Sequence, residues 1–424
     1  MFAAFRRVSL RLMLPLLVLL AACGSVPPET TSPSSTTTSA PTTSAPTTSP
    51  PTTTSPPTTT VAPTTTVAPT TTVAPTTTPP RTYDFSAIAP IVEGFVAEHG
   101  LNGAGLIVVD RDDGVVHHEH WGEFSPDRIS LIASSSKMLV AGVLMRLHED
   151  GLLDIDAPVA EAVPWGSGNP DITPAQLVSN SSGLVGLLPN PAYGPYVCQF
   201  LPVGTLQGCA ESIFSTAVDD ADIVPPDTEF RYGGGQWQVA GGLAEAVSGR
   251  SWAELLDEVY VEPCDLDVLA FNNHFTQFES EAFAYPDAFG GDPSGLVATD
   301  NPNMEGGAYT TTGDYGALLL MHLREGMCGD NRVLEPESIA RLHADRTLEA
   351  HPDGSGAPGY GMGWWVDRET GRISDGGAYG TVPWLDLDDG FGAYLVIEAT
   401  SVLGGSLAGQ LFEPVEAAVL AARD

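Results

Sequence analysis

Lysine is almost absent from this chain of 424 residues: Lys137 is the only one, and every other Lys or Arg position is arginine. Positive charge of either kind is scarce, since 17 Lys and Arg residues stand against 53 Asp and Glu residues and the formal net charge is −36. A chain of this charge repels phosphate backbones, so we expect no nucleic-acid partner.

Motifs that would indicate a cofactor or a metal are missing as well. The chain has no CxxC pair and no phosphate-binding loop, so we expect no cofactor. A search for the GxSxG nucleophile motif finds only the near miss Gly404-Gly-Ser406-Leu-Ala408. The run from His117 to His120 invites a metal interpretation. Alternate residues of a strand face opposite ways, however, so at most His118 and His120 converge, and we expect no metal site.

The amino-terminal apolar stretch is too short to span a bilayer. It runs from Leu12 to Ala22 behind three arginines, a pattern that predicts a signal peptide over residues 1–22. The stretch ends in Leu-Ala-Ala-Cys23, which resembles the bacterial lipobox. We therefore expect a lipid-modified Cys23 that anchors the protein to the outer side of the cell membrane; the alternative is an ordinary cleaved signal peptide.

A low-complexity segment follows, and we expect it to be a disordered linker over residues 23–82. It consists almost wholly of Thr, Pro, Ser, Ala and Val, and it includes three tandem Val-Ala-Pro-Thr-Thr-Thr repeats. Such a composition has no core to bury and favours an extended chain. The simplest interpretation is a spacer that lifts the next domain off the membrane, and O-glycosylation would stiffen it.

Residues 83–424 are numerous enough for one large domain or two lobes. Their patterns predict strands near both ends of this segment and a mainly helical, loop-rich middle from residue 155 to about 303. The predicted helices cover residues 85–99, 134–151, 175–180, 236–247, 252–259, 312–325, 336–344 and 407–422, and the predicted strands cover 105–110, 115–121, 361–367, 377–385 and 392–399. We therefore expect an α/β (α+β) fold in which both termini build one lobe, with an active cleft between it and the helical insertion.

Apart from Cys23 the chain has four cysteines, and an even number in an exported protein suggests two disulfides. Four cysteines allow three connectivities. We favour the pairs Cys198 with Cys209, which closes a short loop, and Cys264 with Cys328.

The single lysine stands three residues after Ser134, in the arrangement SxxK. One helical turn puts both side chains on the same face. A buried lysine can lose its proton and act as a base, which arginine cannot do. Met138 to Leu147 reads as an apolar helix whose amino end starts near Ser134, where free amides favour negative charge. The pattern predicts a serine nucleophile.

Several further segments, in order along the chain, resemble the class C β-lactamase and DD-peptidase superfamily, including its β-lactamase-like esterases. The resemblance covers about Tyr83 to Asp424 and rests on six segments: Leu131 to Lys137, Leu144 to Pro158, Ile172 to Leu184, Phe230-Arg-Tyr232, Gly306 to Tyr315, and Gly359 to Val366.

The resemblance implies covalent catalysis. Ser134 would attack a carbonyl carbon, Lys137 and Tyr232 would together take and return the proton, and water would clear the acyl-enzyme. Burial must lower the pKa of Lys137, or Tyr232 must share its task. The backbone amides of Ser134 and Ala378 would form the oxyanion hole.

Two departures from the family pattern bear on the substrate. The family's Asn two residues beyond the tyrosine is Gly234 here, and the Lys-Thr-Gly or His-x-Gly motif corresponds to Asp375-Gly376-Gly377. An acid thus replaces the cation that would meet a substrate carboxylate, unless Arg231 or Arg372 compensates. We expect a monomer that cleaves a neutral ester or amide in a small molecule or peptide. The alternatives are a β-lactamase or D-alanyl-D-alanine carboxypeptidase, and an inert wall-binding or sensory domain.

Overall fold

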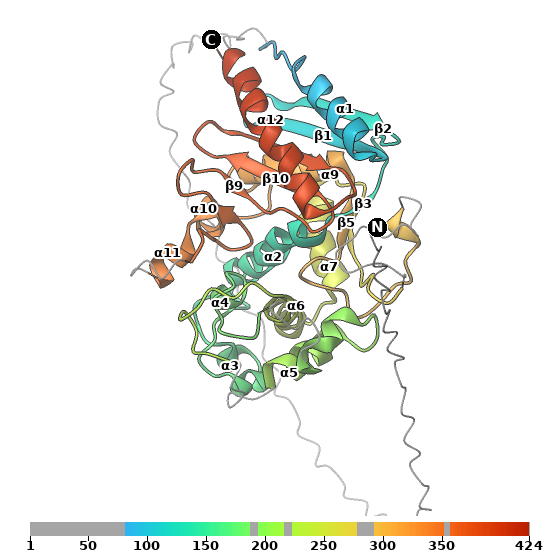
Figure 1. Ribbon diagram of the computed structural model, residues 1–424. Coiled ribbons are helices and arrows are strands. Elements are labelled where there is room, and N and C mark those ends of the chain that lie inside the picture. Colours follow the sequence, from blue (N-terminus) through green and yellow to red (C-terminus); the bar gives the residue numbers. More distant parts are fainter. Residues whose placement is uncertain (1–80, 187–193, 216–222, 278–291, 352–356, 424) are drawn as a thin grey trace, which may run out of the picture. The chain divides into compact units, whose positions relative to one another are not determined.

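The computed structural model describes residues 81–186, 194–215, 223–277, 292–351 and 357–423 (Figure 1). The expected signal peptide, the lipid attachment at Cys23 and the linker up to residue 80 lie outside these residues and stay predictions. Within the described residues, no helix is both long enough and apolar enough to cross a membrane.

Helices and short strands alternate along the described chain. The helices are α1 (Ile88–His99), α2 (Lys137–Glu149), α3 (Val159–Ala162), α4 (Pro174–Leu177), α5 (Leu206–Ser215), α6 (Gly234–Ser248), α7 (Trp252–Leu256), α8 (Glu262–Cys264), α9 (Thr312–Leu323), α10 (Pro336–His343), α11 (Arg346–Ala350) and α12 (Ser401–Ala421). The strands are β1 (Gly103–Asp110), β2 (Gly114–Gly122), β3 (Ser130–Leu131), β4 (Leu269–Phe271), β5 (Ala308–Thr310), β6 (Met327–Cys328), β7 (Asn331–Arg332), β8 (Trp365–Val366), β9 (Ile373–Ser374), β10 (Thr381–Asp386) and β11 (Phe391–Val396).

The main sheet joins the two ends of the domain, as the sequence predicts. Its strand order is β2-β1-β11-β10-β9-β8, and all of its neighbouring pairs are antiparallel. Strand β1 lies beside β11, with Gly105 opposite Val396. The fold is therefore the expected mixed α/β arrangement, with an antiparallel sheet flanked by helices.

Strand β1 is buried on both faces, which explains its unbroken apolar sequence. Its side chains alternate between two cores, as the period of two in a strand requires. Leu106 and Val108 belong to the core beneath α1 and α12, whereas Ile107 and Val109 belong to the larger core that includes α2 and α9. Figure 1 shows α1 and α12 on the same face of the sheet.

Helix α2 lies between the sheet and the helical region formed by α3 to α6 (Figure 1). Most of its residues are buried, including the charged Lys137. Tyr260 donates a hydrogen bond from its hydroxyl to the backbone oxygen of Leu139 at 3.1 Å. The middle of the helix fits closely, because a Cβ added at Gly142 would lie 1.9 Å from that hydroxyl. Helix α2 is thus fixed from both sides, and so is the site at its amino end.

Most predicted elements are present, with shifted ends. The sequence did not predict α3, α5, α8, α11 or the short strands β3 to β7, and the expected strand over residues 377–385 begins only at Thr381. A tight turn precedes that strand, and Gly380 takes φ +82°, a left-handed conformation that glycine adopts without strain. The short strand β9 before this turn was also missed.

Both favoured disulfides are present. Cys198 is bonded to Cys209 and Cys264 to Cys328, with Cα atoms 5.6 and 4.9 Å apart. The second bridge joins α8 to β6 across a sequence separation of 64 residues. The first one holds the segment before α5 against that helix, and this segment matters for the site described next.

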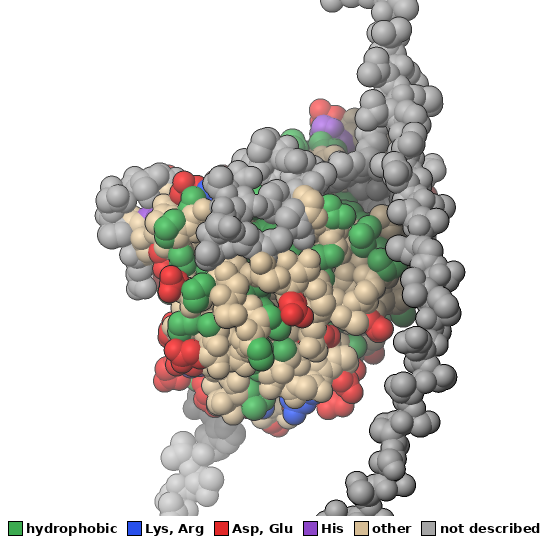
Figure 2. All heavy atoms as spheres, turned by 90° about the horizontal axis from the view of Figure 1, so that it is seen from below, with side chains coloured by type: hydrophobic (Ala, Val, Ile, Leu, Met, Phe, Trp, Pro, Cys, Tyr) green, Lys and Arg blue, Asp and Glu red, His purple; other side chains and the backbone are tan. Residues whose placement is uncertain are grey.

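Figure 2 shows one face of the molecule, seen from below relative to Figure 1. Acidic side chains, in red, are scattered over this face singly and in small groups, and very little blue is visible. The acidic excess of the sequence is therefore spread over this surface, which offers no basic patch for a polyanion.

Candidate active site

Ser134 and Lys137 lie at the amino end of α2. Ser134 belongs to a single turn of 3-10 helix, Ala133–Ser136, that continues directly into α2. The Lys137 ammonium nitrogen Nζ donates to Ser134 Oγ at 3.0 Å and to the backbone oxygen of Glu305 at 2.7 Å. The lysine is 0% exposed. The SxxK spacing therefore places a fully buried amine against the serine hydroxyl.

The residue before the serine has a strained backbone. Ala133 takes φ +48°, a left-handed conformation that is uncommon for residues other than glycine. Its backbone oxygen accepts a hydrogen bond from Ser136 Oγ at 2.6 Å, and Gly306 packs against it, since a Cβ at Gly306 would lie 3.2 Å from the Ala133 carbonyl carbon. Such strain persists only where the surroundings hold it, and it is concentrated at functional sites.

Tyr232 lies beside this pair, two residues before α6 begins. Lys137 Nζ lies 4.8 Å from the centre of the tyrosine ring, and the ring stacks on Trp365 with centroids 5.3 Å apart. Burial raises the pKa of Tyr232, while the charge of Lys137 and the nearby polar groups of Ser134 and Lys137 act in the opposite direction. The structure thus brings together the three residues to which the sequence assigns proton transfer and nucleophilic attack.

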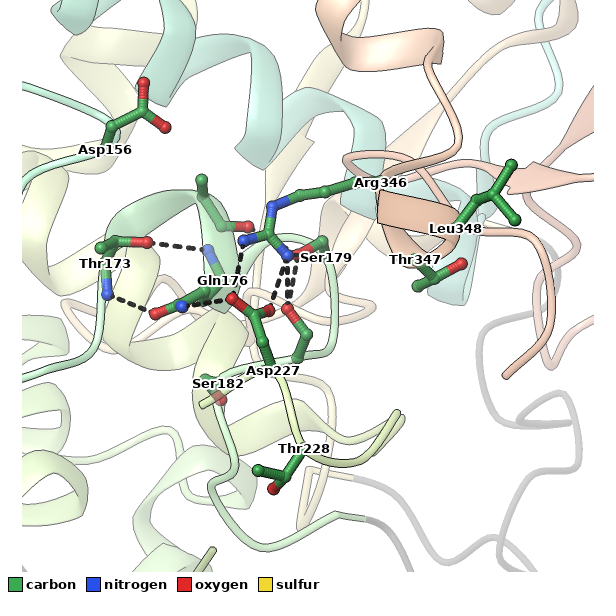
Figure 3. A network of polar contacts seen from close by, with 12 residues as sticks. Asp156, Thr173, Gln176, Ser179, Ser182, Asp227, Thr228, Arg346, Thr347 and Leu348 are labelled. Atoms are coloured by element: carbon green, nitrogen blue, oxygen red, sulfur yellow. Dashed lines mark hydrogen bonds and ion pairs between the residues drawn. The ribbon is translucent and has the colours of Figure 1, made fainter. Parts of the chain in front are cut away.

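A polar network fixes the segment that leads to this tyrosine (Figure 3). Arg346, on α11, forms an ion pair with Asp227 at 2.9 Å and donates to Ser179 Oγ at 3.1 Å. Gln176, on α4, donates to the second oxygen of Asp227 at 2.6 Å, and the Asp227 amide donates to the backbone oxygen of Ser181. Burial raises the pKa of Asp227, but Arg346 and Gln176 outweigh it and hold the pKa below its ordinary value. The network joins three separate segments behind the tyrosine.

The predicted oxyanion hole has both of its parts near each other. Ala378 packs into a small apolar cluster with Ala133, the residue before Ser134. Gly377 lies against the same turn, because a Cβ there would come within 2.2 Å of the Ile132 oxygen. The amides of Ser134 and Ala378 donate to no backbone acceptor that is recorded among the described residues. This is compatible with the expected oxyanion hole, which stays a prediction.

Gly234, which replaces the family's Asn, is the first residue of α6, and the space of the missing side chain is filled. A Cβ at this position would lie 2.1 Å from Gln199 Oε1 and 2.3 Å from Glu305 Cδ. The ends of these two side chains converge on the point where an asparagine side chain would start. The Glu305 carboxyl group thus occupies the position that the asparagine side chain has in the family pattern.

Restoring the asparagine is expected to be tolerated only when the carboxyl group is removed. Gly234→Asn should lower the free energy of unfolding by about 1 to 3 kcal/mol through overpacking. In a Glu305→Ala background the same change should lower the free energy of unfolding less. The two effects should differ by about 1 kcal/mol or more, because substitutions at contacting residues are not additive. Urea denaturation of the four proteins measures this coupling.

The matched control for that cycle is Gly405→Asn. Gly405 also lies near the start of a helix, α12, but a Cβ there meets nothing within 4 Å. Its stability effect should be the same with and without Glu305→Ala. Equal effects of Gly234→Asn in the two backgrounds would show that Glu305 does not occupy the asparagine position.

The sequence led us to expect that the Asp375 carboxyl group faces the substrate, but in the structure this group is buried. Its side chain is 0% exposed, and neither carboxyl oxygen has a hydrogen-bond partner among the described residues. Its backbone oxygen accepts a hydrogen bond from Ser135 Oγ at 2.6 Å, which holds the residue against the turn that carries Ser134. Gly376 beside it is exposed and Gly377 is buried. The carboxyl group therefore acts on its buried neighbours, and direct repulsion of a substrate carboxylate is not its first effect.

Three acidic groups surround the single lysine. Burial raises the pKa of Asp375 well above its ordinary value and also raises that of Glu305, and the charge of Lys137 opposes both shifts. Burial by itself lowers the pKa of Lys137, but the charges of Tyr232, Glu305 and Asp375 outweigh it and raise the pKa. Of the two alternatives that the sequence left open, this direction favours the one in which Tyr232 shares the task of Lys137.

Neither arginine considered as a substitute cation serves the site. Arg231 forms an ion pair with Glu229 at 2.9 Å. Arg372 stacks on Phe412 at 4.2 Å and lies 3.9 Å from Glu416, both on α12, the helix that covers the outer face of the sheet. The acidic replacement at position 375 is therefore not compensated by these two arginines.

The histidine run on β2 forms a separate polar contact. His118 and His120 converge, as the strand geometry predicts, with ring centroids 4.6 Å apart, and each ring lies within hydrogen-bonding distance of Thr312 Oγ1. Burial lowers the pKa of both rings. Among the described residues, no group of three or more potential metal ligands comes together.

The sequence did not single out Glu305 or Gln199. Both could have been suspected from their neighbours, since Glu305 precedes the Gly306-Gly307 segment of the family pattern and Gln199 follows the bridged Cys198. Neither position carries a motif of its own. Only the fold brings them to the place of the missing asparagine.

Known proteins of similar sequence include a penicillin-binding protein and a hydrolase. Penicillin-binding protein 4 of Amycolatopsis lactamdurans is 26% identical over 329 residues, which span 73% of this chain and 82% of that protein. The teichoic acid D-alanine hydrolase of Staphylococcus aureus (strain MRSA252) is 22% identical over 310 residues, which span 71% of this chain and 69% of that protein.

Solved structures and a family model agree with this similarity. The crystal structure of a protein described as a β-lactamase from Bacteroides dorei DSM 17855 superposes with a TM-score of 0.62 and 25% identity, covering 80% of this chain and 99% of that one. The family model for beta-lactamase matches residues 88–405. That match includes the serine, lysine and tyrosine described above, and the chain belongs to the beta-lactamase family of serine hydrolases.

Proposed function

We propose that this chain is a lipid-anchored, extracytoplasmic hydrolase that cleaves a carboxylic ester or amide through an acyl-enzyme on Ser134. The observation that carries the proposal is the contact of 3.0 Å between Lys137 Nζ and Ser134 Oγ at a fully buried position. A carboxylate would stabilise a buried ammonium group better than a serine hydroxyl does. The contact with Ser134 is therefore better explained by catalysis than by stability.

The geometry supports the following reaction. Ser134 Oγ attacks the carbonyl carbon while its proton passes to the Lys137 and Tyr232 pair. The amides of Ser134 and Ala378 stabilise the oxyanion, and removal of one such donor typically costs about 2.7 to 4 kcal/mol in the barrier. The carbonyl re-forms, and the departing alcohol or amine takes the proton. Water then repeats the sequence on the acyl-enzyme, which releases the acid and restores the serine.

Charge in the site favours substrates without a carboxylate near the scissile bond. Glu305 and Asp375 both stand close to Lys137, and the two candidate arginines are engaged elsewhere. Cleavage of penicillin or of D-alanyl-D-alanine is therefore disfavoured relative to other esters and amides. The name of the Staphylococcus aureus relative describes a hydrolase of D-alanine on teichoic acid, which supports a substrate in the cell envelope.

The location rests on the sequence. The lipobox at Cys23 and the Thr/Pro-rich linker over residues 23–82 would hold residues 83–424 at a distance from the membrane surface. A monomer on such a tether would reach substrates in the surrounding wall.

Covalent labelling tests the proposal. A fluorophosphonate probe is expected to add one phosphonyl group to the purified protein, and peptide mapping should place it on Ser134. A panel of p-nitrophenyl esters, nitrocefin and D-amino-acid peptides then separates esterase, β-lactamase and peptidase. No adduct on Ser134 and no turnover of any of the three would favour the inert wall-binding domain.

A further inference from the structure

Two oxygen acceptors occupy the place where the side chain of the family's asparagine would start. A single point, the place of a Cβ on Gly234, lies 2.4 Å from Glu305 Oε1 and 2.1 Å from Gln199 Oε1. No hydrogen bond or ion pair to the Glu305 carboxyl is recorded among the described residues, although its backbone oxygen binds Lys137. Glu305 as a whole residue is half-buried, and its carboxyl oxygens are not among the fully buried atoms that lack a partner, so a ligand can reach them.

Gln199 is an unusual neighbour for a carboxyl group. The residue is 5% exposed, and its Oε1 is buried with no hydrogen-bond partner among the described residues. A buried acceptor without a donor typically costs about 1 to 3 kcal/mol. A buried oxygen that lacks a donor and lies beside a carboxyl group indicates that a ligand supplies the missing donor.

The position of Gln199 is not accidental, because its backbone is held from several sides. Its backbone oxygen accepts hydrogen bonds from Asn273 Nδ2 and Asn303 Nδ2, each at 3.0 Å. The preceding Cys198 is bridged to Cys209 on α5. These contacts fix the start of the side chain and direct its oxygen towards Glu305.

Charge in the site also calls for a cation. Lys137 faces two carboxyl groups, those of Glu305 and Asp375, so the buried cluster has one negative charge in excess when both acids are ionised. A primary ammonium has three donors and one positive charge, which matches two oxygen acceptors and the excess charge. A carboxylate ligand at this point would meet two acceptors and be rejected.

We propose that Glu305 and Gln199 form a binding site for a primary ammonium group, and that the acyl donors of this enzyme carry a free amine on the carbon next to the scissile carbonyl. The proposal rests on the proposed acyl-enzyme function. The amine belongs at that carbon because the Glu305 backbone contacts Lys137, and Lys137 in turn contacts Ser134 Oγ, so the subsite adjoins the reacting atoms. The substrate class is that of unblocked α-amino acid esters and amides.

A pair of matched substrates tests the ammonium site. The benzyl esters of alanine, in both enantiomers, and of isobutyric acid differ only in an ammonium group that replaces a methyl group. With the unmodified protein near neutral pH, kcat/KM for the better alanine ester should exceed that for the isobutyrate ester by about tenfold or more, as expected for hydrogen bonds to a charged group. Release of benzyl alcohol measures both reactions.

Variants assign the preference to named side chains. Glu305→Gln keeps the shape and the backbone contact with Lys137, and it should reduce the alanine to isobutyrate ratio by about tenfold or more. Gln199→Leu should reduce the same ratio. Glu413→Gln removes an equal charge from the exposed side of α12 and should leave the ratio unchanged. A ratio, unlike a rate, does not respond to partial loss of folded protein.

Each outcome is decisive. Equal or faster cleavage of isobutyrate by the unmodified protein overturns the ammonium site while the proposed hydrolase stands. A ratio that neither Glu305→Gln nor Gln199→Leu changes also overturns it. If neither ester is cleaved and the fluorophosphonate adduct on Ser134 is absent, the proposed function fails and the ammonium site fails with it.

Discussion

Replacing Ser134 with alanine is expected to lower kcat/KM for every substrate of this chain by on the order of 10⁶-fold. The loss is this large because the covalent intermediate cannot form, and only binding and the oxyanion hole remain. Stability should change little, because the serine hydroxyl is a small group with few partners to lose. Steady-state hydrolysis and intact-mass detection of the acyl-enzyme are the measurements.

The matched control is Ser406→Ala. Ser406 stands in the near miss to a second nucleophile motif, and it is exposed on α12. Its replacement should leave both hydrolysis and probe labelling unchanged. Activity that survives Ser134→Ala but disappears with Ser406→Ala would move the nucleophile to α12 and overturn the assignment based on SxxK.

Local spacing made the centre of the site predictable. Ser134 and Lys137 are three residues apart at a helix start, and one helical turn determines their contact whatever the rest of the fold does. The pairing of β1 with β11 was predictable for a related reason. Strong apolar strands at both ends of a domain need a shared sheet to bury them.

Long-range packing explains what the sequence left open. Glu305 and Gln199 meet at Gly234 from segments that are distant in the chain, and no periodicity encodes their meeting. The burial of Asp375 has the same origin. Its position in the motif suggested an acid that faces the substrate, but the turn before β10 directs it inward, where its charge acts on Lys137.

The two substitutions in the family pattern are parts of one change. Gly234 makes room for the Glu305 carboxyl, and Asp375 puts a second acid where a cation is usual. Either change alone would alter the charge balance around Lys137. With the proposed ammonium site, the two changes together would convert a site that suits an anion into one that suits a cation, while Lys137 keeps its contact with Ser134.

Replacing Lys137 with methionine is expected to lower kcat/KM by about 10² to 10⁴-fold, the usual contribution of a general base. Methionine keeps most of the buried volume and removes the proton acceptor. Lys137→Arg should lose a similar factor, because a guanidinium keeps its proton. Thermal denaturation checks that both variants fold. Full activity of Lys137→Met would leave Tyr232 as the sole base.

The pH dependence of the unmodified enzyme follows from the same groups. The pKa values of Lys137 and Tyr232 are both raised, so the proton-accepting form is a minority at neutral pH. Activity should therefore increase with pH, by about tenfold per unit between about 6 and 9, and should not level off near neutrality. Glu305 and Asp375 also act on Lys137, and burial raises the pKa of both carboxyl groups, so their ionisation adds to the pH dependence.

A single resonance can test this directly, because Lys137 is the only lysine of the chain. Protein labelled with ¹⁵N at lysine Nζ should give one ammonium signal, and its titration reports the pKa of that residue alone. The signal should stay that of a charged amine throughout the neutral range. In Asp375→Asn the pKa of Lys137 should be lower, because one of the three negative charges that raise it is gone. A neutral amine at pH 7 in the unmodified protein would reverse the order of these effects: burial would then outweigh the three acids, and activity would level off near neutrality.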